Sequence, residues 1–168
     1  IGGKVVRFHV LANSDSEADQ TLKLAVRDRV LQEYGDLLET CTSKEETLAA
    51  LKNAQQEISE TAEAEVLAQG YTYPVRVSLV REEFPFKKYG DLIFPAGVYD
   101  ALRIEIGEAK GKNWWCVLYP QMCYVDAAWG YSTEESHVRL QNTLTKEEFL
   151  VVSAMEQKKV TPKIKCRL

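Results

Sequence analysis

The chain has 168 residues, of which 45% are apolar and 27% are charged, and its formal net charge is -4. This balance is typical of one globular domain that buries a sizeable core, and it argues against a disordered chain. Nonspecific binding to nucleic acid or to anionic membranes needs a net basic surface, so the acidic balance also argues against those partners.

The first predicted element is a β-strand over residues 5–11, because apolar side chains recur at every second position. Val6, Phe8 and Val10 occupy one face of this strand, and Arg7, His9 and Leu11 occupy the other. The strand runs into residues 12–16 (ANSDS), whose short polar side chains are typical of a helix N-cap. A helix is therefore predicted to begin here, with Glu17 or Asp19 completing a capping box.

Two long amphipathic helices are predicted next. Apolar side chains recur at spacings of three and four from Leu22 to about Glu39, which places an apolar stripe on the core. A second capping signal, Ser43 with Glu46, opens another helix with the same kind of stripe. Gly70 stands where the C-terminal cap of that second helix is expected.

After residue 73 the pattern changes to that of strands. Period-two alternation predicts strands over residues 75–79 and 102–106, with a short strand at 91–94 in the segment between them. Residues 107–113 are predicted to form a hairpin loop. The run 114–119 (WWCVLY) has no charged member, which predicts a strand in the middle of the sheet that is covered on both faces.

A short helix is predicted over residues 146–155, and the basic tail from about residue 157 is expected to be loosely held. Because no internal repeat or linker interrupts the sequence, residues 1–168 are predicted to form one α+β domain. Its expected architecture is a largely antiparallel β-sheet with two long helices packed on one face.

The four cysteines form no C-x-x-C pair, so neither a thioredoxin-like redox site nor a metal site is predicted. Cys116 and Cys123 are close enough in the chain to form a disulfide if the segment between them turns back at Pro120. The alternative is that both are buried free thiols, and composition alone does not decide between the two.

Catalysis by an imidazole would have to use His9 or His137, and no common hydrolase or nucleotide-binding motif accompanies them. His9 is the better candidate, because Asn13, Asp15 and the amides of the following helix can converge with it on a ligand. We favour the alternative, in which His9 packs beneath the helices with its ring hydrogen-bonded, and Asn13 and Asp15 cap the helix. No metal, cofactor or enzymatic activity is therefore predicted.

A loop rich in aromatic and cationic side chains is the best candidate for a partner-binding surface. Residues 84–90 (FPFKKYG) combine three aromatic rings with two lysines, and such side chains are favoured at interfaces. The predicted contact residues are Phe84, Phe86, Lys87, Lys88 and Tyr89, together with Trp114, which points to the opposite face of its strand from Trp115. The alternative is that Phe84 and Phe86 fold back to cap the core.

Three stretches of the sequence resemble the stage II sporulation protein R family. They are residues 7–16 (RFHVLANSDS), residues 95–103 (PAGVYDALR) and, after Gly107, residues 111–120 (GKNWWCVLYP). The resemblance covers most of the chain from about Lys4 to about Asp126, and its most specific part is the KNWWC run. Beyond residue 127 it is weak.

The resemblance implies an exported signal of endospore-forming bacteria, made in the forespore and delivered to the space between the two membranes. There it activates a membrane-embedded aspartic-type peptidase of the mother cell, which processes the precursor of a mother-cell sigma factor. Members of the family have no assigned catalytic residue. They usually carry an N-terminal hydrophobic export segment that is missing from this sequence, and such a segment would bring the domain close to a membrane.

An exported location favours the bridge between Cys116 and Cys123, and it suggests more weakly a second bridge between Cys41 and Cys166. Two functional hypotheses follow from the sequence. The first is a ligand that activates the peptidase by binding it. The alternative is an extracytoplasmic hydrolase or cell-wall-acting enzyme whose pocket surrounds His9, Asn13 and Asp15.

Overall fold

The computed structural model describes residues 1–89, 92–122 and 134–157 of the chain, so the predicted loose tail lies outside the described residues. The helices are η1 (Gly2–Lys4), α1 (Glu17–Glu39), α2 (Lys44–Ala68), α3 (Glu134–Thr143) and α4 (Lys146–Gln157). The strands are β1 (Val6–Leu11), β2 (Val75–Phe84), β3 (Lys87–Tyr89), β4 (Leu92–Phe94), β5 (Gly97–Ile106) and β6 (Asn113–Tyr119).

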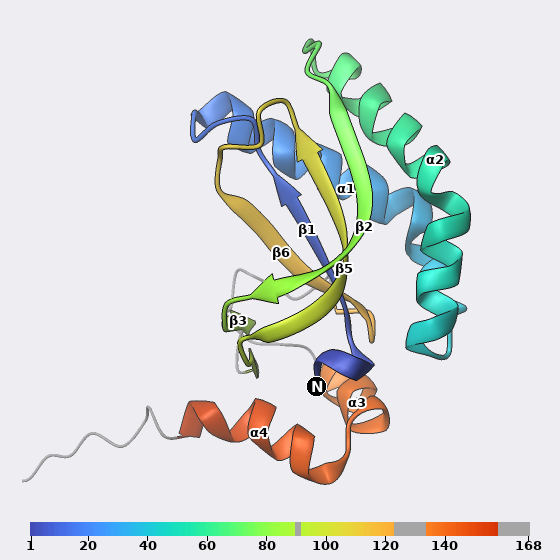
Figure 1. Ribbon diagram of the computed structural model, residues 1–168, viewed down its shortest axis with the longest axis vertical. Coiled ribbons are helices and arrows are strands. Elements are labelled where there is room, and N and C mark those ends of the chain that lie inside the picture. Colours follow the sequence, from blue (N-terminus) through green and yellow to red (C-terminus); the bar gives the residue numbers. More distant parts are fainter. Residues whose placement is uncertain (90–91, 123–133, 158–168) are drawn as a thin grey trace, which may run out of the picture.

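The main sheet has four strands in the order β2-β5-β1-β6, and β3 and β4 form a separate two-stranded hairpin. β1 runs parallel to β5, whereas the pairs β1–β6 and β2–β5 are antiparallel. Figure 1 shows α1 and α2 side by side against one face of this sheet, with α3 and α4 at its lower end. The predicted α+β class, a largely antiparallel sheet with two long helices on one face, is therefore confirmed.

The helix boundaries follow the capping signals in the sequence. The Ser16 hydroxyl accepts a hydrogen bond from the Asp19 amide at the start of α1, and the Ser43 hydroxyl accepts one from the Glu46 amide at the start of α2. After α2, Gly70 adopts a φ of +88°, and the next amide reaches back 3.1 Å to a carbonyl of the last turn. This is the left-handed C-terminal cap that a glycine favours.

The two faces of the sheet pack into different clusters. The helix-covered face carries the larger one, which includes Val6, Phe8 and Val10 of β1 with Ile58 of α2 and Leu102 of β5. The second cluster lies on the opposite face and at the lower end of the sheet. It contains Phe84, Phe94, Tyr99, Val117 and Val152, so it joins the hairpin and α4 to the sheet.

Two predictions about strand order were wrong. β6 pairs with β1 alone among the described strands, so it lies at an edge and not in the middle of the sheet. Its apolar run is explained by cover on both faces, because Arg27 of α1 lies over Trp114 and Phe84 packs against Trp115. Residues 107–112 do not form a hairpin loop, since β5 and β6 flank β1 instead of pairing with each other.

The C-terminal part of the described chain was predicted only partly. The helix predicted over residues 146–155 is present as α4, and the Thr145 hydroxyl caps it by accepting the Glu148 amide at 3.1 Å. α3 was not predicted, because residues 134–143 carry few apolar side chains from which a periodic stripe could be recognised.

Candidate functional site

The loop between β5 and β6 crosses the end of β1, and the predicted pocket residues Asn13 and Asp15 hold it there. The Asn13 side-chain oxygen accepts the Glu108 amide at 2.8 Å, and an Asp15 carboxylate oxygen accepts the Lys112 amide at 2.8 Å. The backbone amide of Gly111 also donates to Ala12 O at 2.9 Å. The loop between β5 and β6 is therefore fixed across the upper end of the sheet by hydrogen bonds to the segment that follows β1.

Two glycines make this crossing sterically possible. A Cβ atom on Gly107, whose φ is +60°, would lie 2.2 Å from the Asn13 side-chain oxygen. A Cβ atom on Gly111 would lie 2.3 Å from Ser14 O. Both separations are far below a van der Waals contact, so any side chain at either position would push the loop away from β1.

The same residues also prepare the start of α1. The Ser14 hydroxyl and the Asn13 side-chain amide both donate to the Asp19 carboxylate, at 2.5 and 2.9 Å. These hydrogen bonds, first from Ser14 and then from Asn13, lower the pKa of Asp19. Asn13 thus joins the crossing loop to the first turn of α1, which accounts for its position without a ligand.

His9 lies on the face of the sheet that the helices do not cover. Its Nε2 atom lies 2.9 Å from an oxygen of Glu82 on β2, and its side chain is 7% exposed. The ring centroid is 5.2 Å from that of Phe84 and 5.9 Å from that of Trp115. His9 therefore sits between a carboxylate and two aromatic rings, away from the crossing that holds Asn13 and Asp15.

Arg103 of β5 connects this histidine to a second carboxylate. Its Nη1 lies 2.9 Å from Glu82 and its Nε lies 3.0 Å from Glu105. Burial lowers the pKa of His9; the Glu82 charge opposes this shift and the Arg103 charge adds to it. Since the net effect is a lowered pKa, the ring is neutral near pH 7.

A neutral imidazole beside a carboxylate can accept a proton, which is the chemistry of a general base. Among the described residues, the polar side chains that act on the His9 ring include Glu82, which lies 2.9 Å from Nε2, and Asn113. Neither supplies the hydroxyl or thiol that a histidine-dependent hydrolase activates. The described residues also contain no group of three or more His, Cys, Asp or Glu side chains that could hold a metal ion.

A buried cation–π cluster links this face to the hairpin. It consists of Arg7 and the rings of Phe84, Phe94 and Tyr99. Arg7 is 0% exposed. The three ring centroids lie 5.0, 5.5 and 4.8 Å from its guanidinium carbon, respectively. Cation–π contacts of this kind are strongest when they are shielded from water. The alternation in β1 placed Arg7 on the correct face, but it gave no signal for the three rings that surround the guanidinium.

The six predicted partner-binding residues are divided between two faces and two environments. Phe84 is 3% exposed and belongs to the core, as the alternative prediction had it, whereas Phe86 is 58% exposed. Lys87 and Lys88 are exposed beside Phe86 on β3, and Tyr89 closes that strand. Trp114 lies on the other face of the sheet, where its ring contacts Phe8 and Arg27. The structure therefore leaves the consecutive residues Phe86, Lys87 and Lys88 exposed, with the Lys87 ammonium 5.9 Å from the centre of the Trp115 ring, and separates Trp114 from them.

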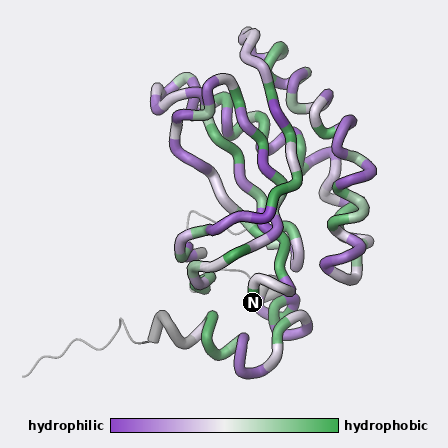
Figure 2. The backbone as a smooth tube through the Cα atoms, in the orientation of Figure 1, coloured by the Kyte–Doolittle hydropathy of each residue, from purple (hydrophilic) through white to green (hydrophobic). Residues whose placement is uncertain are grey.

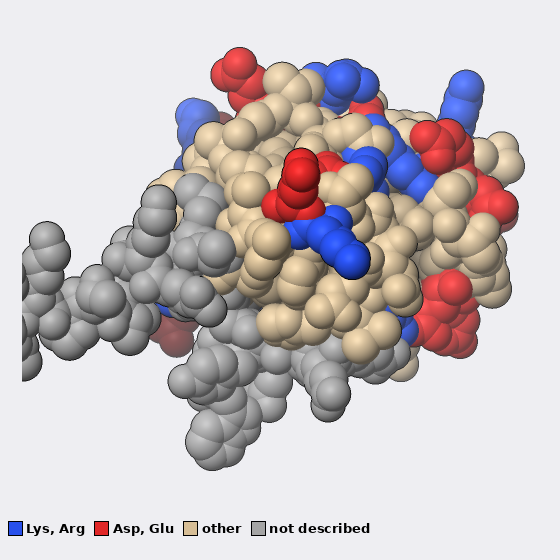
Figure 3. Space-filling view, turned by 90° about the horizontal axis from the view of Figure 1, so that it is seen from below, with Lys and Arg blue, Asp and Glu red and all other residues tan. Residues whose placement is uncertain are grey.

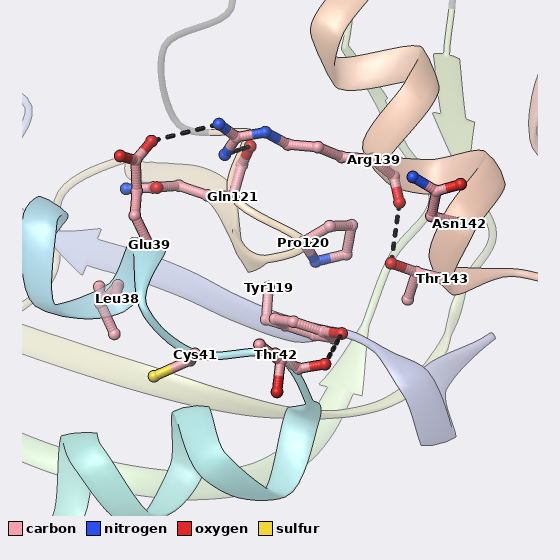
Figure 4. Close-up of a pocket in the computed structure, with 10 residues that line it drawn as sticks. All are labelled: Leu38, Glu39, Cys41, Thr42, Tyr119, Pro120, Gln121, Arg139, Asn142 and Thr143. Atoms are coloured by element: carbon pink, nitrogen blue, oxygen red, sulfur yellow. Dashed lines mark hydrogen bonds and ion pairs between the residues drawn. The ribbon is translucent and has the colours of Figure 1, made fainter.

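A pocket of about 220 Å³ lies between the α1–α2 turn, the end of β6 and α3 (Figure 4). Its polar groups are largely paired with one another: the Tyr119 hydroxyl donates to Thr42 O at 3.0 Å, and Arg139 lies 3.2 Å from the Glu39 carboxylate. These contacts attach α3 to the body of the domain. The half-buried Cys41 lines the same pocket.

The two disulfide predictions have different outcomes. Cys116 is buried on β6, but its predicted partner Cys123 lies outside the described residues, so the bridge from Cys116 to Cys123 stays a prediction. Cys41 is a free thiol in the structure, which contradicts the weaker prediction of a bridge from Cys41 to Cys166. Within the described ranges, none of the helices combines the length and the hydropathy that crossing a bilayer requires.

The domain is thus an α+β scaffold with a buried His–Glu–Arg cluster on one face, a crossing loop at one end and an exposed hairpin at the other. The family model of stage II sporulation protein R matches residues 2–129. The chain is also 36% identical over 135 residues to the protein named Stage II sporulation protein R from Bacillus subtilis (strain 168). The aligned part is 80% of this chain and 60% of the relative's length. No solved structure matches the chain significantly.

The chain belongs to the stage II sporulation protein R family, so the resemblance inferred from its sequence is confirmed. The stretches that carried the resemblance include the two sides of the crossing, with Asn13 on one side and Gly107 and Gly111 on the other. A structural need for close backbone approach is therefore sufficient to explain these residues. α3 and α4 follow the matched residues.

Proposed function

We propose that this domain is the exported signal of endospore formation that activates a membrane-embedded aspartic-type peptidase. It acts in the space between forespore and mother cell, and the activated peptidase processes the precursor of a mother-cell sigma factor. The observation that carries this proposal is membership of the stage II sporulation protein R family. Activation occurs without a bond being made or broken by this domain.

A ligand can activate a resting enzyme only if it binds the active conformation more tightly than the resting one. The hairpin β3–β4 has the features that such a contact needs. Phe86 is 58% exposed, and two exposed lysines follow it. The hairpin is held to the sheet because Phe94 of β4 packs against the guanidinium of Arg7. A rigid aromatic anchor loses little conformational freedom on binding.

The test is reconstitution of the purified domain with the peptidase in lipid vesicles, with cleavage of the sigma-factor precursor as the readout. Wild-type domain is expected to switch on cleavage. Phe86→Ala removes a ring that is 58% exposed, and it should raise the domain concentration needed for half-maximal cleavage by about tenfold or more. Leu37→Ala, which truncates a 44% exposed residue on α1, is the matched control.

The results separate the two levels of this proposal. No cleavage with any amount of wild-type domain would overturn the proposed function. If wild type, Phe86→Ala and Leu37→Ala reach half-maximal cleavage at the same domain concentration, the proposed function stands but the hairpin is not part of the contact.

The His9–Glu82 pair favours one alternative function, an extracytoplasmic hydrolase or cell-wall-acting enzyme. Such an enzyme would need the imidazole as a base. A His9→Gln domain that folds and still activates the peptidase at wild-type concentrations would reject the alternative. Hydrolysis of cell-wall material by the wild type and not by His9→Gln would support it.

A further inference from the structure

The outer side of α4 exposes apolar side chains at the lower end of the molecule. Val152 is 0% exposed and anchors α4 in the second core cluster, whereas the preceding Leu150 and Val151 are 60% and 47% exposed. Figure 2 shows the hydrophobic stretch within α4, and Figure 3 shows broad uncharged areas on this end of the molecule. Exposed apolar side chains that lie together in this way are typical of an interaction site.

A shallow hollow of about 390 Å³ accompanies this face, between α3 and α4. It is lined by Phe149 and Leu150, which supply an apolar floor, and by Gln141 and Lys146 at its rim. The ring of Phe149 contacts the ring of His137 at a centroid distance of 6.3 Å, so the two helices are packed together at the hollow.

Lys146 gives the rim an unbalanced charge. Its side chain is exposed, and the ion pairs found among the described residues do not include it. It precedes Leu150 by four residues, so both side chains lie on the same side of α4. A ligand that fits the hollow therefore places an apolar group on Leu150 and a carboxylate beside Lys146.

This combination favours a protein segment over the other occupants. Lys146 is the one cation among the described residues that line the hollow, and a single lysine is too little charge to hold a domain on an anionic bilayer. A second copy related by twofold symmetry would bring its own Lys146 towards this one. An amphipathic helix with an acidic side chain one turn from its apolar anchor satisfies both the floor and the rim.

We infer that the hollow between α3 and α4 docks an amphipathic, acidic segment of the peptidase named above, and this inference rests on that proposed function. The match to the family model ends at residue 129, before α3, so the hollow lies outside the matched residues. The hairpin and α4 lie at the same end of the domain, because α4 packs on β4. The segment therefore strengthens binding of the peptidase that this chain serves.

The experiment uses the whole domain and vesicles that contain the peptidase. Leu150→Ser should raise the domain concentration for half-maximal cleavage of the precursor about tenfold, with an unchanged maximal rate. Leu67→Ser is the matched control, because Leu67 on α2 is 64% exposed and far along the chain from the hollow. Lys146→Glu should have an effect similar to that of Leu150→Ser, and Lys52→Glu on α2 should have none.

Each other outcome decides against the inference. If wild type activates and Leu150→Ser does so at the same concentration as Leu67→Ser, the hollow is not a docking site and the proposed function stands. If vesicles without the peptidase bind the wild-type domain but do not bind the Leu150→Ser variant, the occupant is a bilayer. If sedimentation shows a wild-type dimer that Leu150→Ser dissociates, the occupant is a second copy. Wild type that activates nothing overturns the proposed function and the inference with it.

Discussion

The two faces of β1 are buried to the same extent but filled by different chemistry. Phe8 and Val10 point to the helices and are 0% exposed, as is Arg7 on the other face, and His9 there is 5% exposed. The helix-covered face is packed with aliphatic and aromatic side chains from α1 and α2. The other face holds a guanidinium and an imidazole against the ring of Phe84.

This difference shows how a small domain can cover its second sheet face largely without long helices. The end of β2 and the following hairpin supply rings that cover polar side chains of β1, α4 covers the lower end, and Glu82 and Glu105 pair with Arg103 of β5. Apolar packing tolerates substitution by residues of similar volume, whereas buried charges depend on individual partners. We therefore expect the face that holds Arg7 and His9 to be more sensitive to single substitutions.

The largest expected effect is that of Phe84→Ala. Phe84 contacts Arg7, His9 and Trp115, so its truncation leaves a cavity and removes the cover of a buried cation. The free energy of unfolding should fall by about 3 to 5 kcal/mol, the usual range for truncating a buried ring. Urea unfolding followed by circular dichroism measures this change.

Phe86→Ala is the matched control, because the two phenylalanines are two residues apart and differ mainly in burial, at 3% and 58% exposed. Its effect should stay within about 0.5 kcal/mol. Equal losses for the two variants would contradict the comparison, since both rings would then be loop residues of the same kind.

The contrast between the faces also explains what the sequence could predict. Period-two alternation assigned the correct face to Phe8 and His9, and local capping signals at Ser16 and Ser43 fixed the starts of both long helices. These signals are local in the chain. Phe84 was instead placed among the contact residues of a loop, because its neighbours in space come from β1, β5 and β6 and none of them is near in sequence.

The candidate sites show the same limit. The pocket hypothesis grouped His9 with Asn13 and Asp15 by proximity in the chain, and the favoured alternative packed His9 beneath the helices. The partner that lies 2.9 Å from its ring is instead Glu82, 73 residues further on, and the ring lies on the face opposite to α1 and α2. Strand order decides this pairing, since β5 lies between β1 and β2, and its Arg103, which is in register with His9, also contacts Glu82. The sequence signals strands without ordering them, and β6 was placed in the middle of the sheet for the same reason.

A smaller effect is expected at the end of β1, where the crossing loop closes both faces. Asn13→Ala removes the acceptor for the Glu108 amide and a donor to Asp19. The free energy of unfolding should fall by about 1 to 2 kcal/mol, the value of one or two lost hydrogen bonds. Hydrogen exchange should be faster at the Glu108 amide. Unchanged exchange and stability would show that Asn13 does not hold the loop and would return it to the pocket hypothesis.

The smallest effect is a pH dependence that arises on the face of the sheet that holds His9. Burial lowers the pKa of His9 from its ordinary value near 6.5. Below that pH the unfolded chain therefore binds a proton at His9 more readily than the folded chain does, which favours unfolding. The free energy of unfolding should therefore fall as the pH is lowered from 7.5 to 5.5. His9→Gln does not titrate, so the fall should be smaller in that variant. If acidification stabilised the wild type more than His9→Gln, the attraction of Glu82 would outweigh burial, and this face would hold charge as an ion pair in place of a neutral ring.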